Sequence, residues 1–279
     1  MEILITNDDG YKAKGIHALA GIMRKFGHIT AIAPKKHQSG MGMAVDLGLK
    51  QTAYRDLGVE DDVHWSYLDG TPASCVKMGL FLPFRDRKPD WVVCGINHGS
   101  NATTGSCYSG TLGAAQEAAL NGIPAIGVSL DSGSPDADFS AVEALFPDIL
   151  RRLMDSLPQR KGIYYNVNFP NRPLEEIRGV RVATQGHGHW EKEFTAWNPD
   201  HFLSQGITAE LLGRSTEIRL EEGEELYMMT GTYVDEDNVE DADHHLLAKG
   251  YVTIVAHNLY TTDFQEVERL RGMGMESIF

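Results

Sequence analysis

Two adjacent acidic residues near the start of the chain could together bind a metal ion or take part in catalysis. Asp8 and Asp9 stand between Asn7 and Gly10, directly after the apolar run 3–5, which has the character of a buried strand. Successive side chains on a strand point to opposite faces, so both carboxylates can serve one site only where the backbone turns. Gly10 permits such a turn. Neighbouring anions repel each other unless a cation or a shared proton offsets them, and a divalent ion bound through oxygen would do so.

The same four residues also form ordinary turns, because Asn, Asp and Gly are common turn formers. The quartet alone therefore leaves a metal site and a simple turn as alternatives. Two further polar clusters, 35–42 and 97–111, each follow a predicted strand. Ligands in open α/β sheets bind beyond the carboxyl ends of the parallel strands, so we expect the three clusters to meet at one edge. That expected convergence favours the metal site.

The cluster 35–42 places the Ser39 hydroxyl beside two flexible glycines. Its Gly40-x-Gly42 pattern resembles the start of a dinucleotide-binding fingerprint. However, Val45 stands where the third small residue would be needed, and the pattern does not open directly from a strand. Binding of a dinucleotide cofactor is therefore disfavoured.

The cluster 97–111 ends in Ser109, Gly110 and Thr111, directly before a predicted helix. Backbone N–H groups and hydroxyls at a helix N-terminus can hold a phosphate. Ser109 or Thr111 can equally cap the helix, and the two roles are compatible. The sequence contains no G-x-x-x-x-G-K-[ST] motif, so a P-loop is excluded.

The histidines give no recognisable hydrolase signature. Neither H-E-x-x-H nor G-x-S-x-G occurs, so a zinc hydrolase and a Ser-His-Asp hydrolase both fit poorly. His98 adjoins Asn97 in the predicted pocket, and its role is left open. The other paired histidines are expected on the surface or in loops: His187, His189, His244 and His245.

The first half of the chain alternates between strand-like and helix-like segments, which predicts a mostly parallel α/β sheet. Strands are expected over 3–5, 29–33, 91–94, 125–130 and 164–168, and helices over 16–26, 71–81, 113–120 and 139–153. Short alternating strands follow over 179–184, 215–220 and 225–232, which indicates antiparallel hairpins. A last strand over 251–256 leads to a helix near Thr262, where Gln265 completes a capping-box pattern.

We therefore divide the chain into three parts. An α/β catalytic core covers 1–177, and a hairpin-rich arm or subdomain covers 178–242. The segment 243–279 contains the final strand and helix, which return to the core or to a partner subunit. Spacing alone does not decide whether the hairpins form a subdomain or an oligomerisation arm.

Composition limits the classes of partner. The chain has 279 residues, of which 42% are hydrophobic, so it can bury a sizeable core. Lys and Arg number 25 against 39 Asp and Glu, a net charge of −14, which argues against nucleic-acid polymers and anionic membranes. Small anionic substrates remain possible, because a metal ion or a helix N-terminus makes a site locally positive.

No apolar run approaches the length of a membrane span, and the first strand begins almost at Met1. We therefore expect a cytoplasmic protein. Cys75, Cys94 and Cys107 are odd in number and lack C-x-x-C spacing, which indicates neither a disulfide framework nor a zinc site.

Several short motifs, taken in order, resemble those of the SurE (survival protein E) nucleotidases. They are Asn7–Gly10 with Ala13, Gly15 and Ile16; Ala33-Pro34 with Ser39-Gly40; Gly70-Thr71-Pro72 with Cys75-Val76; Gly95-Ile96-Asn97; and Tyr108–Thr111. The resemblance runs from Met1 to about Leu130, with weaker similarity at Asp243 and at Gly250-Tyr251.

The resemblance implies a metal-dependent phosphatase that acts on nucleoside monophosphates. It implies a three-layer α/β/α Rossmann-like sandwich, a homodimer or homotetramer, and one divalent metal ion per subunit. The ion would be held at the positions matching Asp8, Asp9, Ser39 and Asn97. All four residues offer oxygen ligands, which agrees with Mg²⁺ or Mn²⁺.

Four positions depart from the family pattern. Ser74 stands where Asp is common, Thr103 replaces a glycine, and Ala44 and Asp46 replace hydroxyl residues. These changes concern the wall of the pocket more than the metal ligands. They leave the substrate preference open.

Our hypothesis is phosphomonoester hydrolysis by metal-activated water, with Asp8, Asp9 and Asn97 as catalytic residues. Asn97 and the turn Ser109, Gly110 and Thr111 would bind the phosphoryl oxygens. The sequence does not choose which aspartate accepts the proton, and an aspartyl nucleophile is a further alternative. It also leaves open the preferred base, the 5′ or 3′ position, the physiological metal and the oligomer size.

Two other classes of function remain alternatives. The first is a nucleotide-binding regulatory protein with little catalytic activity. The acidic pair argues against it, because a phosphate binder gains nothing from two carboxylates beside its ligand. The second is a scaffold assembled through the hairpin arm.

Overall fold

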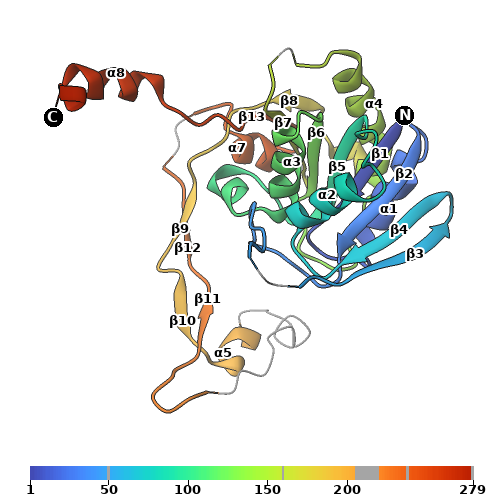
Figure 1. The fold of residues 1–279 in the computed structure, drawn as a ribbon. Coiled ribbons are helices and arrows are strands. Elements are labelled where there is room, and N and C mark those ends of the chain that lie inside the picture. Colours follow the sequence, from blue (N-terminus) through green and yellow to red (C-terminus); the bar gives the residue numbers. More distant parts are fainter. Residues whose placement is uncertain (49–50, 159, 205–219, 237–238, 278–279) are drawn as a thin grey trace. The chain divides into compact units, whose positions relative to one another are not determined.

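The computed structural model describes the chain except for residues 49–50, 159, 205–219, 237–238 and 278–279. The described residues form two compact units, one of 1–186 with 239–279 and one of 187–238. The first unit contains a nine-stranded sheet of order β3-β4-β2-β1-β5-β6-β7-β13-β8 (Figure 1).

The sheet is mostly parallel, as the alternating pattern predicts. Its strands are β1 (Glu2–Thr6), β2 (His28–Pro34), β3 (Tyr54–Glu60), β4 (Val63–Leu68), β5 (Trp91–His98), β6 (Ala125–Leu130), β7 (Ile163–Phe169), β8 (Val180–Val182) and β13 (Val252–Asn258). Parallel pairing runs from β4 through β2, β1, β5 and β6 to β7. At one end β3 is antiparallel to β4, and near the other end β13 is antiparallel to β7. The last strand, β8, is parallel to β13.

Helices cover both faces of this sheet, so the expected three-layer sandwich is confirmed (Figure 1). They are α1 (Lys14–Met23), α2 (Pro72–Phe81), α3 (Gly110–Leu120) and α4 (Ser140–Asp155), followed later by α7 (Asp243–Ala248). The last helix, α8 (Phe264–Gly272), contains no buried residue and is not one of the helices that cover the sheet. Ile3 and Ile5 of β1 belong to a core cluster with residues of α1 and α4. Leu4, between them, packs in a second cluster with residues of α2 and α3. Because successive side chains of β1 point to opposite faces of the sheet, this strand contributes to both hydrophobic layers.

The second unit consists of short antiparallel pairs. β9 (His189–Glu191) pairs with β12 (Thr232–Val234), and β10 (Phe194–Ala196) pairs with β11 (Tyr227–Met229). The helix α5 (Pro199–Ser204) follows β10. The predicted strand over 215–220 falls almost wholly outside the described residues.

The boundary before this unit lies at Gly186 rather than at Arg178. The reason is that β8 pairs in parallel with β13 and so joins the large sheet instead of forming an antiparallel hairpin. Thr184 then forms a bridge with Ala242, which holds the next residues to the first unit.

Other differences from the sequence-based expectations have local causes. The hairpin of β3 and β4 was not predicted, because β3 is largely exposed and its side chains do not alternate in polarity. The capping box at Thr262 is wrong: Asp263 caps α8, and its side chain accepts the N–H groups of Gln265 and Glu266. Among the described residues, no helix has the length and apolar character needed to cross a membrane.

Candidate active site

The three polar clusters meet at the carboxyl ends of the parallel strands, as expected. The backbone N–H of Gln38, after β2, donates to the carbonyl of Asp8 over 2.7 Å. The backbone N–H of His98, at the end of β5, donates to Asp9 Oδ2 over 3.2 Å. The loop that leads into α3 contacts the same place through Thr111. Loops from three regions of the chain therefore surround the acidic pair.

The residues from Asn7 to Gly10 form a tight turn. Asn7 Nδ2 donates to the carbonyl of Gly10 over 3.0 Å, and the Gly10 N–H donates to Asn7 Oδ1 over 3.3 Å. Gly10 has φ +103°, a conformation that L side chains rarely adopt. A simple turn and a site formed by two acids are therefore compatible, because this turn places both Asp8 and Asp9 at the same edge of the sheet.

Asp8 is buried against the N-terminus of α3. Asp8 is only 3% exposed to solvent, and Thr111 Oγ1 donates to its Oδ1 over 2.7 Å. Gly110 makes the close approach possible, since a Cβ there would lie 2.8 Å from Asp8 Cβ and 3.0 Å from Asp8 Oδ2. Burial, reinforced by the charge of Asp9, raises the pKa of Asp8 to about 6.

Asp9 has the opposite electrostatic character. Burial alone would raise the pKa of Asp9, but hydrogen bonds from His37 and His98 lower it below its usual range. His98 Nδ1 lies 2.8 Å from Asp9 Oδ2, and His37 Nδ1 lies 3.4 Å from Asp9 Oδ1. One carboxylate is therefore held in the ionised form while its neighbour resists ionisation.

The remaining predicted residues lie around this pair. Asn97, 7% exposed, donates from Nδ2 to the carbonyl of Gly99 over 2.8 Å. Ser39 is exposed and follows Gln38, whose backbone contacts Asp8. Ser109 caps α3, because its Oγ accepts the N–H of Leu112 over 3.1 Å. Of the two hydroxyls proposed as helix caps, Ser109 takes that role.

Two histidines contribute more than the sequence indicated. His37 had no role in the sequence interpretation, since one exposed histidine in a polar loop gives no spacing signal. The role of His98 was left open, although its position beside Asn97 pointed to the pocket. In the structure His98 contacts Asp9 and packs edge-on against Phe139, with ring centroids 5.2 Å apart.

Comparison with known proteins identifies the family. Residues 3–192 match the family model described as Survival protein SurE. The chain belongs to the SurE family. It is 38% identical over 256 residues to the 5′-nucleotidase SurE of Christiangramia forsetii, covering 91% of this chain and 89% of that protein. It is 36% identical over 271 residues to the 5′-nucleotidase SurE of Flavobacterium johnsoniae, covering 96% and 95% of the two chains.

A solved SurE structure supports the same assignment. The crystal structure of the SurE protein from Aquifex aeolicus is similar with a TM-score of 0.77 and 26% identity. The match covers 98% of this chain and 99% of the other. The resemblance inferred from the ordered motifs is therefore confirmed at the level of the SurE family and its fold.

Two of the departures from the SurE pattern have visible structural settings. Ser74, in α2, has its Oγ 3.0 Å from Thr71 Oγ1. The Thr71 hydroxyl donates to the carbonyl of Ala44 over 2.6 Å. Thr103 has φ +58°, a left-handed conformation that suits the glycine expected there better than a β-branched residue.

Proposed function

We propose that this SurE-family chain is a 5′-nucleotidase that hydrolyses nucleoside monophosphates to nucleoside and phosphate. The observation that carries the proposal is the contact between the buried Asp8 carboxylate and the first turn of α3. It brings a pair of acids together with a helix N-terminus, the element that best accommodates a phosphate. The name shared by the relatives, 5′-nucleotidase SurE, supports the same activity.

A hard divalent ion fits the acidic pair. Asp8 is buried beside another carboxylate, and its raised pKa measures how poorly the surroundings offset its charge. The side chains of Asp8, Asp9, Ser39 and Asn97 can each bind a metal ion through an oxygen atom, which suits Mg²⁺ or Mn²⁺. We assign these four residues as the ligands of one ion per subunit. When bound, the ion supplies a Lewis acid and a water of lowered pKa.

The chain's own groups bind and orient the ester. The free N–H groups that begin any α-helix would face the phosphoryl oxygens at Gly110 and Thr111. Ser109 fixes that end of α3 by capping it. The Asn97 amide, near the end of β5, would bind a further phosphoryl oxygen. His37 and His98 keep Asp9 ionised and oriented.

Phosphate release from a panel of nucleoside monophosphates tests this function. We expect release with Mg²⁺ or Mn²⁺, loss on adding EDTA, and recovery when metal is restored. Asp8→Asn and Asp9→Asn should each lower turnover severely, whereas Asp86→Asn, at an exposed position, should leave it unchanged. A protein that binds nucleotides but releases no phosphate under any metal condition would instead be a regulatory binder.

The chemical role of Asp8 can be separated from that of the metal-activated water. A direct aspartyl nucleophile would form a covalent phospho-enzyme during turnover. We expect no such species after rapid acid quenching, because attack comes from water. Stereochemistry at phosphorus gives a second readout: one direct displacement by water inverts the configuration, whereas two displacements through a phospho-enzyme retain it, and inversion is the expected result.

We further propose that the unit 187–238 mediates a homodimer or homotetramer. Several large hydrophobic side chains of this unit are exposed, namely Trp190, Phe194, Tyr227, Met229 and Tyr233. Replacing 187–238 by a short flexible linker should reduce the mass measured by light scattering to that of a monomer. The deletion starts at 187, since β8 is part of the main sheet. The cytoplasmic location expected from the sequence stays a prediction.

A further inference from the structure

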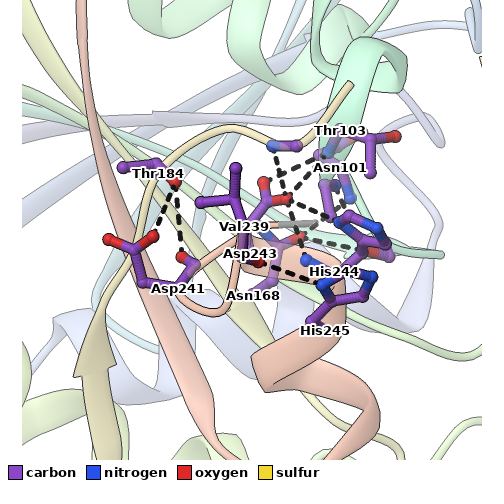
Figure 2. Close-up of polar contacts among 12 residues, drawn as sticks. Asn101, Thr103, Asn168, Thr184, Val239, Asp241, Asp243, His244 and His245 are labelled. Atoms are coloured by element: carbon purple, nitrogen blue, oxygen red, sulfur yellow. Dashed lines mark hydrogen bonds and ion pairs between the residues drawn. The ribbon is translucent and has the colours of Figure 1, made fainter. Parts of the chain in front are cut away.

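A buried carboxylate outside the acidic pair joins three separate backbone segments. Asp243, the first residue of α7, is fully buried. Its Oδ1 accepts the N–H groups of His244 over 2.8 Å, Gly186 over 3.0 Å and Thr103 over 3.2 Å. Its Oδ2 also accepts the Thr103 N–H, over 3.1 Å (Figure 2). Burying a carboxylate costs free energy unless hydrogen-bond donors offset it, and the N–H groups of these three segments do so for Asp243.

Thr103 needs the support that Asp243 provides. Its φ of +58° lies in the left-handed region, which a β-branched side chain disfavours. Such a conformation persists only where the surrounding structure holds it. Asp243 binds the N–H of this residue with both oxygens, from a position 140 residues away in the sequence.

Thr103 begins the segment that leads to the phosphate turn. The short 3₁₀ helix η1 (Thr103–Cys107) starts here and is followed by Tyr108 and the cap residue Ser109. The carbonyl of Tyr108 accepts the N–H of Gly42 over 2.8 Å, which ties the end of η1 to the loop after β2. A change in the conformation of Thr103 would therefore be carried along η1 to the first turn of α3.

The residues just before Thr103 are fixed independently. The backbone of Asn101 donates to Asn168 Oδ1 over 2.8 Å and accepts from Asn166 Nδ2 over 2.8 Å. Asn101 Nδ2 donates to Ser129 Oγ over 2.8 Å. These contacts anchor the loop on β6 and β7. Asp243 is then the group that sets the direction in which the chain leaves this anchor.

We propose that Asp243 is a positioning residue for the nucleotidase site. It holds Thr103 in its left-handed conformation and thereby sets where Gly110 and Thr111 meet Asp8. Asp243 touches neither the acidic pair nor the phosphate turn directly, so its effect passes through the backbone of η1. The inference rests on the proposed function only for its activity readout.

Asp243→Asn is the direct test, because the amide keeps the size of the side chain but removes one acceptor oxygen. Misplacement of a binding group by about 1 Å can lower the rate about a hundredfold, and we expect a loss of kcat/KM of about tenfold to a hundredfold. The matched control is Asp241→Asn. Asp241 is exposed, lies two residues away and contacts Thr184 rather than Thr103 (Figure 2). Its kcat/KM should stay within about twofold of wild type.

A second-site change distinguishes positioning from a general loss of stability. Glycine adopts φ near +58° without a supporting contact, so Thr103→Gly should restore a large part of the kcat/KM lost in Asp243→Asn. The same change should not restore Asp8→Asn. If Asp243→Asn loses activity and Thr103→Gly gives no recovery while the melting temperature is unchanged, the proposal is overturned.

Hydrogen exchange gives a readout that does not depend on activity. Amides of 103–111 should exchange faster in Asp243→Asn than in Asp241→Asn, while those of β1 and β5 stay protected. Should Asp243→Asn fail to fold, the wild-type Thr103 amide decides: it must exchange as slowly as the strand amides. Fast exchange there, or unchanged protection in the folded variant, overturns the positioning role. An inactive wild-type protein with the expected exchange pattern would overturn only the nucleotidase assignment.

Discussion

Thr111 Oγ1 donates a 2.7 Å hydrogen bond to Asp8 Oδ1, joining two residues 103 positions apart in the sequence. This bond connects the turn after β1 with the first turn of α3. Because the Thr111 hydroxyl donates its proton to Asp8, the backbone N–H groups are the donors that this turn can offer to a phosphoryl oxygen. The acidic pair and the proposed phosphate-binding turn are thus joined by a direct hydrogen bond.

Thr111→Val should show what the hydrogen bond to Asp8 contributes, because valine keeps the shape of threonine and the backbone N–H groups but removes the hydroxyl donor. We expect kcat/KM to fall about tenfold or more, since the hydrogen bond that favours ionised Asp8 is lost. Thr262→Val, at an exposed position, serves as the control. Steady-state kinetics with saturating metal will measure the effect. Equal kinetics for the two variants would contradict the role given to this bond.

Gly110→Ala should abolish activity although alanine favours helices. Its Cβ would lie 2.8 Å from Asp8 Cβ and 3.1 Å from the carbonyl of Gln38, so α3 or the acidic turn must move. Gly21→Ala in α1 is the matched control, because nothing lies within 4 Å of its added Cβ. That control should gain about 0.5–1 kcal/mol in the free energy of unfolding. Thermal melts and phosphate release on both variants give the comparison.

Metal-free protein should show a stability change with pH that originates at Asp8. Its folded-state pKa of about 6 lies above the ordinary 3.8, so the folded state holds the proton more tightly than the unfolded chain. The favourable contribution of protonated Asp8 is therefore full below about pH 4 and is lost as the pH rises through 6.

Asp8→Asn removes this loss of folding stability at neutral pH, because asparagine does not ionise. In EDTA at pH 7 the variant should be more stable than wild type by about 1–3 kcal/mol, from 1.36 kcal/mol per pKa unit. The difference should shrink as the pH falls towards 4. Mn²⁺ should raise the melting temperature of wild type and have little effect on the variant. Urea unfolding at several pH values tests the first point, and a variant less stable than wild type at pH 7 would refute it.

His98→Leu should lower activity through Asp9. Removing the imidazole takes away one of the hydrogen bonds that lower the pKa of Asp9 and leaves its burial uncompensated. His98→Asn retains an N–H donor at a similar place and should keep much more of the activity. His64→Leu removes a comparable pair, His64 with the exposed Asp56 at 2.9 Å, and should leave kinetics unchanged. If all three variants behave alike, His98 has no special role.

The part of the fold that positions the acids could be predicted from the sequence. Apolar residues with a clear period fix β1 and α1, and parallel strands place their following loops at one edge. That rule correctly brought Asp8, Asn97 and Thr111 to the same place. The contacts within the site were not accessible in this way, because the hydrogen bond of His37 to Asp9 depends on loop conformation.

Asp243 illustrates a second limit. Its similarity to the SurE pattern was visible, but its purpose was not, because its partners at Thr103 and Gly186 are far away in sequence. The left-handed Thr103 likewise has no local signature. Only the folded chain reveals that an ill-suited residue and a buried acid compensate each other.

The position of Asp243 after all the assigned ligands in the sequence has a consequence for biosynthesis. A ribosome delivers the acids, the phosphate turn and most of the sheet before the clamp on Thr103 has been translated. β13, which completes the sheet beside β7 and β8, also arrives only then. A nascent polypeptide truncated ahead of α7 should therefore carry every assigned ligand and still be idle, so that hydrolysis begins only after α7 has been added.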